Sequence, residues 1–109
     1  MPITPANASN SSGSDVSTAF DVTIAVVATA EDLVTVPNSP NDRGKTLSLI
    51  NDGPGDVNIG FDADATASDL LIKEGEAYDE HDLAILTKVS IYGATEQPTI
   101  RGILWSGKK

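Results

Sequence analysis

The chain has 109 residues, of which 39% are hydrophobic, and it contains one Trp, two Tyr and two Phe; this length suits a single domain with a thin aliphatic core. Sixteen acidic residues against seven basic ones give a net charge of −9, which disfavours nucleic acid and anionic membranes as partners. The absence of cysteine excludes disulfides and thiolate metal sites, and one histidine, His81, cannot build a His-rich zinc site.

The first segment, from Met1 to about Ala19, is rich in Asn, Ser, Thr and Pro and has little apolar content. Such a composition predicts an extended or flexible N-terminal arm over residues 1–19, followed by one domain over residues 20–109. Fully extended, the arm could span about 60 Å and reach a neighbouring subunit. A tail without a role is an equally good interpretation.

Alternation of apolar and polar residues predicts short strands along the rest of the chain. They are expected at Phe20–Val27, Leu33–Val36, Lys45–Asn51, Asp56–Phe61, Leu70–Lys73, Leu83–Tyr92 and Thr99–Trp105, while Tyr78–Asp82 is ambiguous. The turn formers of Asn51–Asp56 predict that the strands on either side of them pair as a β-hairpin. Regular spacing without an amphipathic helix predicts an all-β fold, a small antiparallel β-sandwich of jelly-roll type, with a closed barrel as second choice.

Two acidic segments are candidates for chemistry. Asp62–Asp69 resembles a calcium loop, but Ala67 stands where the EF-hand pattern needs glycine and Lys73 where it needs glutamate. We therefore expect no metal site there. The second segment is the densest charge cluster of the chain, and it consists of Glu74, Glu76, Asp79, Glu80, His81 and Asp82. A pair of carboxylates or a His–Asp pair could act as acid and base, yet adjacent strand residues point to opposite faces, so a solvated rim is the favoured interpretation. A contact surface for a basic partner is the third.

The last strands predict an interaction surface instead of a reactive centre. In Val89–Tyr92 the apolar phase leaves Tyr92 on the face opposite Val89, and in Thr99–Trp105 the residues Arg101, Ile103 and Trp105 share the face opposite Ile100. If the Ile100 face forms the core, these four side chains (Tyr92, Arg101, Ile103 and Trp105) are candidates for an oligomer or partner interface. A strand buried on both faces is the alternative.

The stretch Arg43–Trp105 resembles a recurrent small β-domain of virion proteins of tailed bacteriophages. The matching features are a basic residue before an apolar strand, the Asn51–Asp56 turn with Val57, Ile59 and Phe61 after it, the Leu71–Glu76 segment, Val89–Tyr92, and a last strand that ends at Trp105. The resemblance implies a structural virion protein such as a capsid decoration (cement) protein, or alternatively a neck, tail or fibre-base module with a host-recognition or carbohydrate-binding role. It transfers no functional residues.

From this resemblance the sequence leads to a non-enzymatic protein without cofactors. We expect a homo-oligomer, with a trimer favoured, that binds the major capsid protein or another virion protein and stabilises the shell by bridging capsomers. The apolar run Ile24–Ala30 has no preceding Lys or Arg and is interpreted as a strand, not as a secretion signal. Assembly in the host cytoplasm and a place on the capsid exterior are the corresponding expectations.

Overall fold

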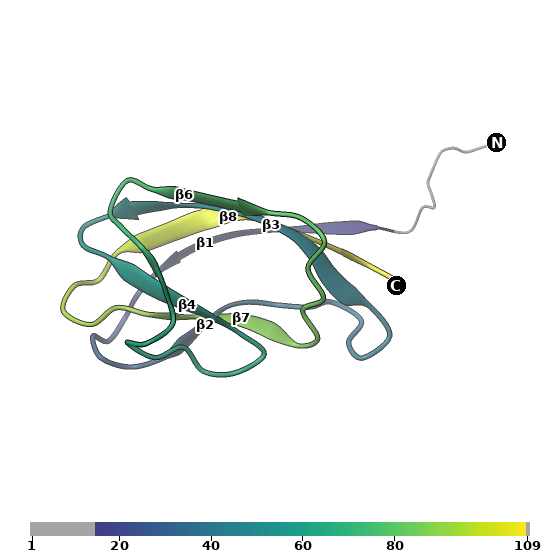
Figure 1. The fold of residues 1–109 in the computed structure, drawn as a ribbon, viewed down its shortest axis with the longest axis horizontal. Coiled ribbons are helices and arrows are strands. Elements are labelled where there is room, and N and C mark those ends of the chain that lie inside the picture. Colours follow the sequence, from purple (N-terminus) through teal and green to yellow (C-terminus); the bar gives the residue numbers. More distant parts are fainter. Residues whose placement is uncertain (1–14, 109) are drawn as a thin grey trace.

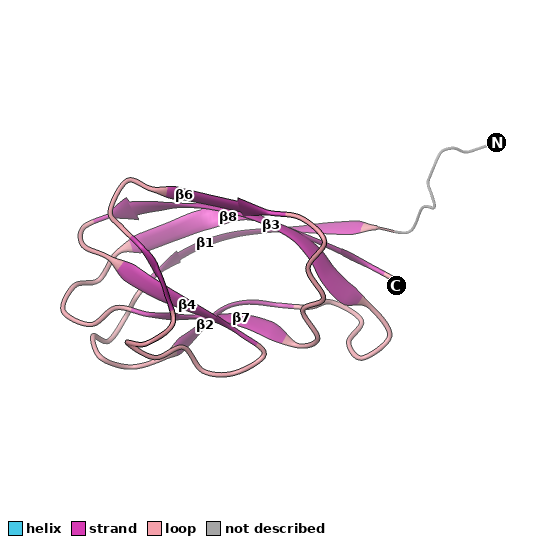
Figure 2. Cartoon of the chain, viewed as in Figure 1, coloured by secondary structure: helices cyan, strands magenta, loops and turns pink. Residues whose placement is uncertain are grey.

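The structure is a computed structural model that describes residues 15–108, and all regular elements in that range are strands (Figure 2). The strands are β1 (Val16–Thr23), β2 (Glu31–Thr35), β3 (Arg43–Gly53), β4 (Val57–Phe61), β5 (Leu70–Ile72), β6 (Ala77–Glu80), β7 (Lys88–Tyr92) and β8 (Thr99–Gly107). They form two four-stranded antiparallel sheets with the orders β1-β8-β3-β6 and β2-β7-β4-β5. The predicted all-β fold, a small antiparallel β-sandwich, is confirmed.

The two sheets lie face to face as separate layers (Figure 1). Alternate residues of each strand point into the space between the layers, as the period of a strand requires. The resulting core is aliphatic; its fully buried residues include Leu47, Ile100 and Leu104 from one sheet and Val57, Val89 and Ile91 from the other. This core leaves the outward face of each sheet free for other uses.

The first strand begins earlier than predicted. Val16–Ala19, which the sequence placed in the arm, belongs to β1 and pairs with β8, with Val16 opposite Ser106. The remainder of the predicted arm, residues 1–14, lies outside the described residues. β1 also ends earlier, because the Glu31 carboxylate accepts hydrogen bonds from the backbone N–H groups of Ala25 (2.9 Å) and Val26 (2.9 Å) and holds a loop there.

The predicted hairpin at Asn51–Asp56 is wrong. β3 pairs with β6 and β8, whereas β4 pairs with β5 and β7, so the segment crosses from one sheet to the other. The fully buried Asn51 holds this crossing: its Nδ2 donates to the carbonyls of Gly55 (3.0 Å) and Ile72 (3.1 Å), and its Oδ1 accepts from the Gly53 N–H (2.8 Å). Turn residues permit a reversal, but here these side-chain bonds satisfy the backbone in place of a partner strand.

The predicted strand Leu83–Tyr92 is shorter in the structure, and β7 begins at Lys88. The Asp62 carboxylate accepts hydrogen bonds from the N–H groups of Leu86 (2.9 Å) and Thr87 (2.7 Å), which fixes this segment as a loop against the β4–β5 connection. Burial raises the pKa of Asp62, but the hydrogen bonds from Thr87, Leu86 and Lys88 lower it by more, so the pKa lies below its ordinary value.

Candidate interaction surface

The outward face of the β1-β8-β3-β6 sheet carries three of the four predicted interface residues. On β8, Ile100 and Leu104 are fully buried, while Arg101, Ile103 and Trp105 alternate with them and point outward. Trp105 is 44% exposed, which is unusual for the one tryptophan of a small acidic domain. The predicted phase of this strand is therefore confirmed.

Short side chains surround this outward row. The register places Ala19 and Ser48 on either side of Ile103, and Ser17 and Thr46 on either side of Trp105. A shallow depression of about 530 Å³ lies beside Ile103, and the small residues Ser48, Ala77 and Gly102 are part of its lining. At the end of the row, Arg101 Nε donates to Asp52 Oδ2 at 2.5 Å, and this hydrogen bond raises the pKa of the guanidinium.

A second depression, of about 550 Å³, lies at the Trp105 end of the same face. Its lining combines the indole and His81 with charged side chains of both signs, which are Asp15, Arg43, Lys45 and Asp82. Lys45 Nζ lies 3.3 Å from Asp15 Oδ1, and the Arg43 guanidinium donates to the carbonyls of Pro40 and Asp42. Sequence reasoning missed this grouping, because His81 follows β6 and meets Trp105 only across β3.

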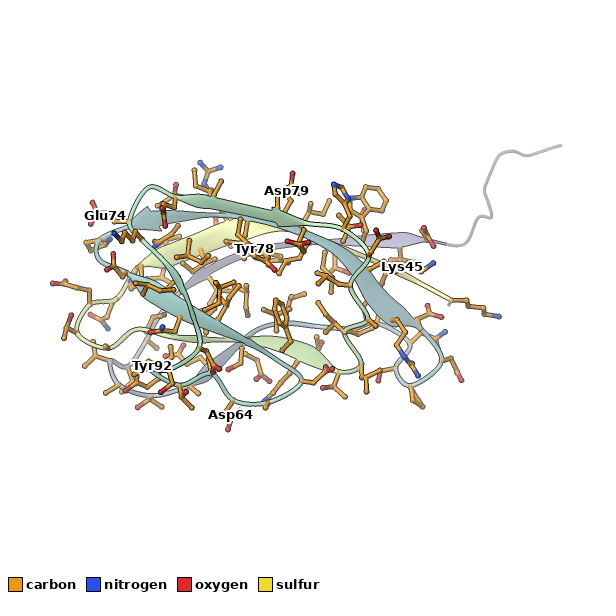
Figure 3. All side chains as sticks on the ribbon, viewed as in Figure 1. Lys45, Asp64, Glu74, Tyr78, Asp79 and Tyr92 are labelled. Carbon is orange, nitrogen blue, oxygen red and sulfur yellow. The ribbon has the colours of Figure 1, made fainter. Side chains whose placement is uncertain are left out.

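Tyr92 does not belong to this surface. It lies on β7 in the other sheet, opposite Asn58, and is half-buried. Figure 3 shows it on the layer opposite the one that carries Asp79. The structure thus separates Tyr92 from Arg101, Ile103 and Trp105, because the partner sheet of β7 could not be read from the phase of its residues.

The acidic cluster of residues 74–82 is not one site. β6 carries the chain from the Glu74 end of the sandwich to the pocket end, where His81 and Asp82 lie, and the adjacent Asp79 and Glu80 oppose Ser48 and Leu47 and so point to opposite faces. Figure 3 shows Glu74 and Lys45 at opposite ends of the molecule. Carboxylates spread in this way do not converge on one substrate.

The carboxylates of the Asp62–Asp69 loop hold the loop itself. Asp62 binds the segment before β7, Asp64 lies 2.7 Å from Lys88 Nζ, and the Asp69 carboxylate accepts from the Thr66 N–H at 2.8 Å. Within residues 15–108, no group of three or more His, Asp or Glu side chains is arranged to hold a metal ion. No helix in the same range is long and apolar enough to cross a membrane.

The edge strand β1 is a further feature that the sequence did not single out. It pairs on one side with β8, and its eight residues contain no Lys, Arg or Pro. Natural proteins commonly place such residues on edges to prevent association. The backbone N–H and C=O groups along the other side of β1 are thus a second surface that another strand could pair with.

Comparison with known proteins supports the class of fold. No protein-family model and no curated protein matches the chain. Among solved structures, the sandwich is similar to a protein of Bacillus endospore appendages, which are described as a family of disulfide-linked pili. The match covers 94% of this chain and 98% of that one with a TM-score of 0.63, at 17% sequence identity. At this identity the likeness shows the fold alone.

This finding corrects the function expected from the sequence. A capsid decoration protein, or a neck, tail or fibre-base module, was expected from turn and strand patterns between Arg43 and Trp105. A solved protein that shares the fold over nearly its whole length is instead a pilus protein of endospores. The expectation of a phage virion role is therefore wrong. Turn and strand patterns are shared by many β-sandwiches and do not distinguish among the assemblies that use them.

Proposed function

We propose that the chain is a non-enzymatic structural subunit that associates with further copies of itself into a filament or appendage. The observation that carries the proposal is the outward row of β8 on the β1-β8-β3-β6 sheet, where the Trp105 indole is exposed and the neighbouring Ile103 is half-buried. Exposed apolar and aromatic groups on one sheet face are typical of surfaces that another protein covers. Arg101 at the end of the row is the third interface residue.

The likeness to a pilus protein over 94% of the chain supports the same class of function. That protein belongs to disulfide-linked pili, whereas these 109 residues contain no cysteine. The contacts that we propose between copies of these residues therefore do not include disulfides. The number of copies in an assembly, for which the sequence favoured three, stays a prediction.

Sedimentation velocity of the purified chain over a hundredfold range of concentration tests this proposal, with negative-stain electron microscopy of the most concentrated sample. The sedimentation coefficient is expected to rise with concentration, and elongated assemblies are expected on the grids. A protein that sediments as a monomer at every concentration contradicts the proposal.

A further inference from the structure

The pocket at the Trp105 end has the features of a receptor for an acidic, ring-bearing knob. Its floor includes an exposed indole, and two basic side chains, Arg43 and Lys45, line it together with His81. Aromatic and arginine side chains in a concave setting are the commonest anchors of protein interfaces. Two carboxylates, Asp15 and Asp82, also line the pocket, and Asp15 is paired with Lys45 at 3.3 Å. The bonds from Arg43 to the Pro40 and Asp42 carbonyls both use Nη1, so other N–H groups of this guanidinium remain to meet an incoming carboxylate.

The opposite end of the same molecule carries such a knob. At the crossing between β3 and β4, Pro54 is exposed and Gly53 before it is buried. Glu74 Oε1 accepts from the Gly55 N–H at 2.8 Å, and the Glu96 side chain lies directly on Gly55, where an added Cβ would be 2.5 Å from the Glu96 Cγ. The exposed Pro54 is therefore next in the chain to a glycine that both glutamate side chains contact. We call Pro54, Asp56, Glu74 and Glu96 the acidic tip.

The tip is held in place by bonds within the molecule. Asp56 Oδ1 accepts from the Glu74 N–H at 3.1 Å, and Asn51 fixes the backbone beneath it through Gly53 and Gly55. Little conformational freedom would thus be lost when the tip enters a partner, which favours binding. Lys73 is the one basic residue among residues 51–56 and 73–76, so the tip keeps an excess of negative charge.

The tip and the pocket lie too far apart to meet within one molecule. β3 runs from the pocket, at Lys45, to the tip, at Gly53, and eight strand residues span about 26 Å. Figure 3 shows Lys45 and Glu74 at the two ends of the sandwich. A contact between these two surfaces must therefore join two molecules.

We infer that the acidic tip of one copy docks into the Trp105 pocket of a second copy. Pro54 would pack on the indole, and the carboxylates of Glu74 and Glu96 would face the Arg43 and Lys45 side of the pocket. Since the two surfaces differ, the contact is head-to-tail and repeats along a line unless the rotation closes a ring. The inference rests on the proposed self-association and names the surfaces that produce it.

The test uses two variants of the full chain. Trp105→Ala removes the anchor of the pocket and leaves the tip intact, while Glu96→Lys reverses a charge of the tip and leaves the pocket intact. Loss of an interface anchor is expected to weaken self-association about 30-fold or more in sedimentation velocity. Two matched controls are expected to associate as the wild type does: Glu80→Lys, the same charge change at an exposed site of β6, and Leu70→Ala, an exposed apolar side chain on the other sheet.

Mixing the two variants gives the decisive result. In an equimolar mixture, the intact tip of Trp105→Ala meets the intact pocket of Glu96→Lys, so 1:1 dimers form and no larger species. Wild-type behaviour of both variants, or a mixture that stays monomeric while the wild type associates, overturns the tip-in-pocket contact and leaves self-association standing. A wild type that is monomeric at every concentration contradicts both the tip-in-pocket contact and the proposed self-association. Circular dichroism of each variant verifies that the fold is retained.

Discussion

Replacing Asn51 by alanine tests whether side-chain hydrogen bonds hold the crossing between the two sheets. The side chain is fully buried and makes three bonds, to the Gly55 carbonyl, the Ile72 carbonyl and the Gly53 N–H. Alanine cannot make any of them. The backbone groups of Gly53 and Ile72 would then lie in the interior without a partner.

The expected loss follows from those orphaned groups. An unsatisfied buried donor or acceptor costs about 1–3 kcal/mol, so two of them lower the free energy of unfolding by about 2–6 kcal/mol. With a urea dependence of about 2 kcal/mol/M, the unfolding midpoint falls by about 1–3 M.

Urea unfolding followed by circular dichroism measures this change. The control is Asn41→Ala, because Asn41 is exposed in the loop before β3, and its midpoint is expected to match the wild type. An Asn51→Ala loss below about 1 kcal/mol would refute the reasoning, since the crossing would then be held by other contacts.

Three further predictions concern the Asp62 carboxylate, the packing of β3 against β8, and Trp105. Asp62→Asn is expected to lower the stability at neutral pH. Because the folded pKa of Asp62 lies below its ordinary value of 3.8, the stabilisation by the wild-type carboxylate is present above about pH 4 and is lost as the pH falls through the folded pKa. The urea midpoints of wild type and variant should therefore converge as the pH falls below 3.8, and a constant gap would contradict the role of the Asp62 carboxylate. Gly102→Ala places a Cβ against the Ser48 carbonyl and 2.7 Å from the Leu49 Cα, so it should lower the free energy of unfolding in urea by about 2–3 kcal/mol. The control is Gly75→Ala, whose Cβ meets no atom within 4 Å but whose φ is +84°, and a loss of about 1 kcal/mol is expected for it. Equal losses for the two variants would argue against close β3–β8 packing. Trp105→Ala should change the unfolding free energy of dilute monomer by less than about 1 kcal/mol, because the side chain is 44% exposed, and a larger loss in the same assay would show that the indole stabilises the monomer.

Alternation within a strand could be predicted well from the sequence. Ile100 and Leu104 point inward and Arg101 and Trp105 outward as expected, because a period of two depends on the strand itself. The same reasoning placed Tyr92 correctly on the face opposite Ile91. It could not place Tyr92 on the other sheet, since that depends on which strands pair.

Pairing was the part that local pattern could not decide. Asn51–Asp56 has the residues of a hairpin turn, but the bond from Asn51 to Ile72 joins residues 21 positions apart and holds a crossing. In the same way, apolar alternation continues to Val26, while the bonds from Ala25 and Val26 to Glu31 end the strand earlier. The pocket combines Lys45, His81 and Trp105 from three segments, so no single stretch of sequence signals it.

The emission of Trp105 tests most directly the central claim that copies of the chain associate through the Trp105 surface. It is the one tryptophan of the chain and 44% exposed in the monomer, so its spectrum reports whether another copy covers this surface. With rising protein concentration, the account predicts a blue shift and weaker quenching by acrylamide, both reversed by high salt as charge contacts are screened. Assemblies that form while the emission of Trp105 stays that of an exposed indole would contradict it.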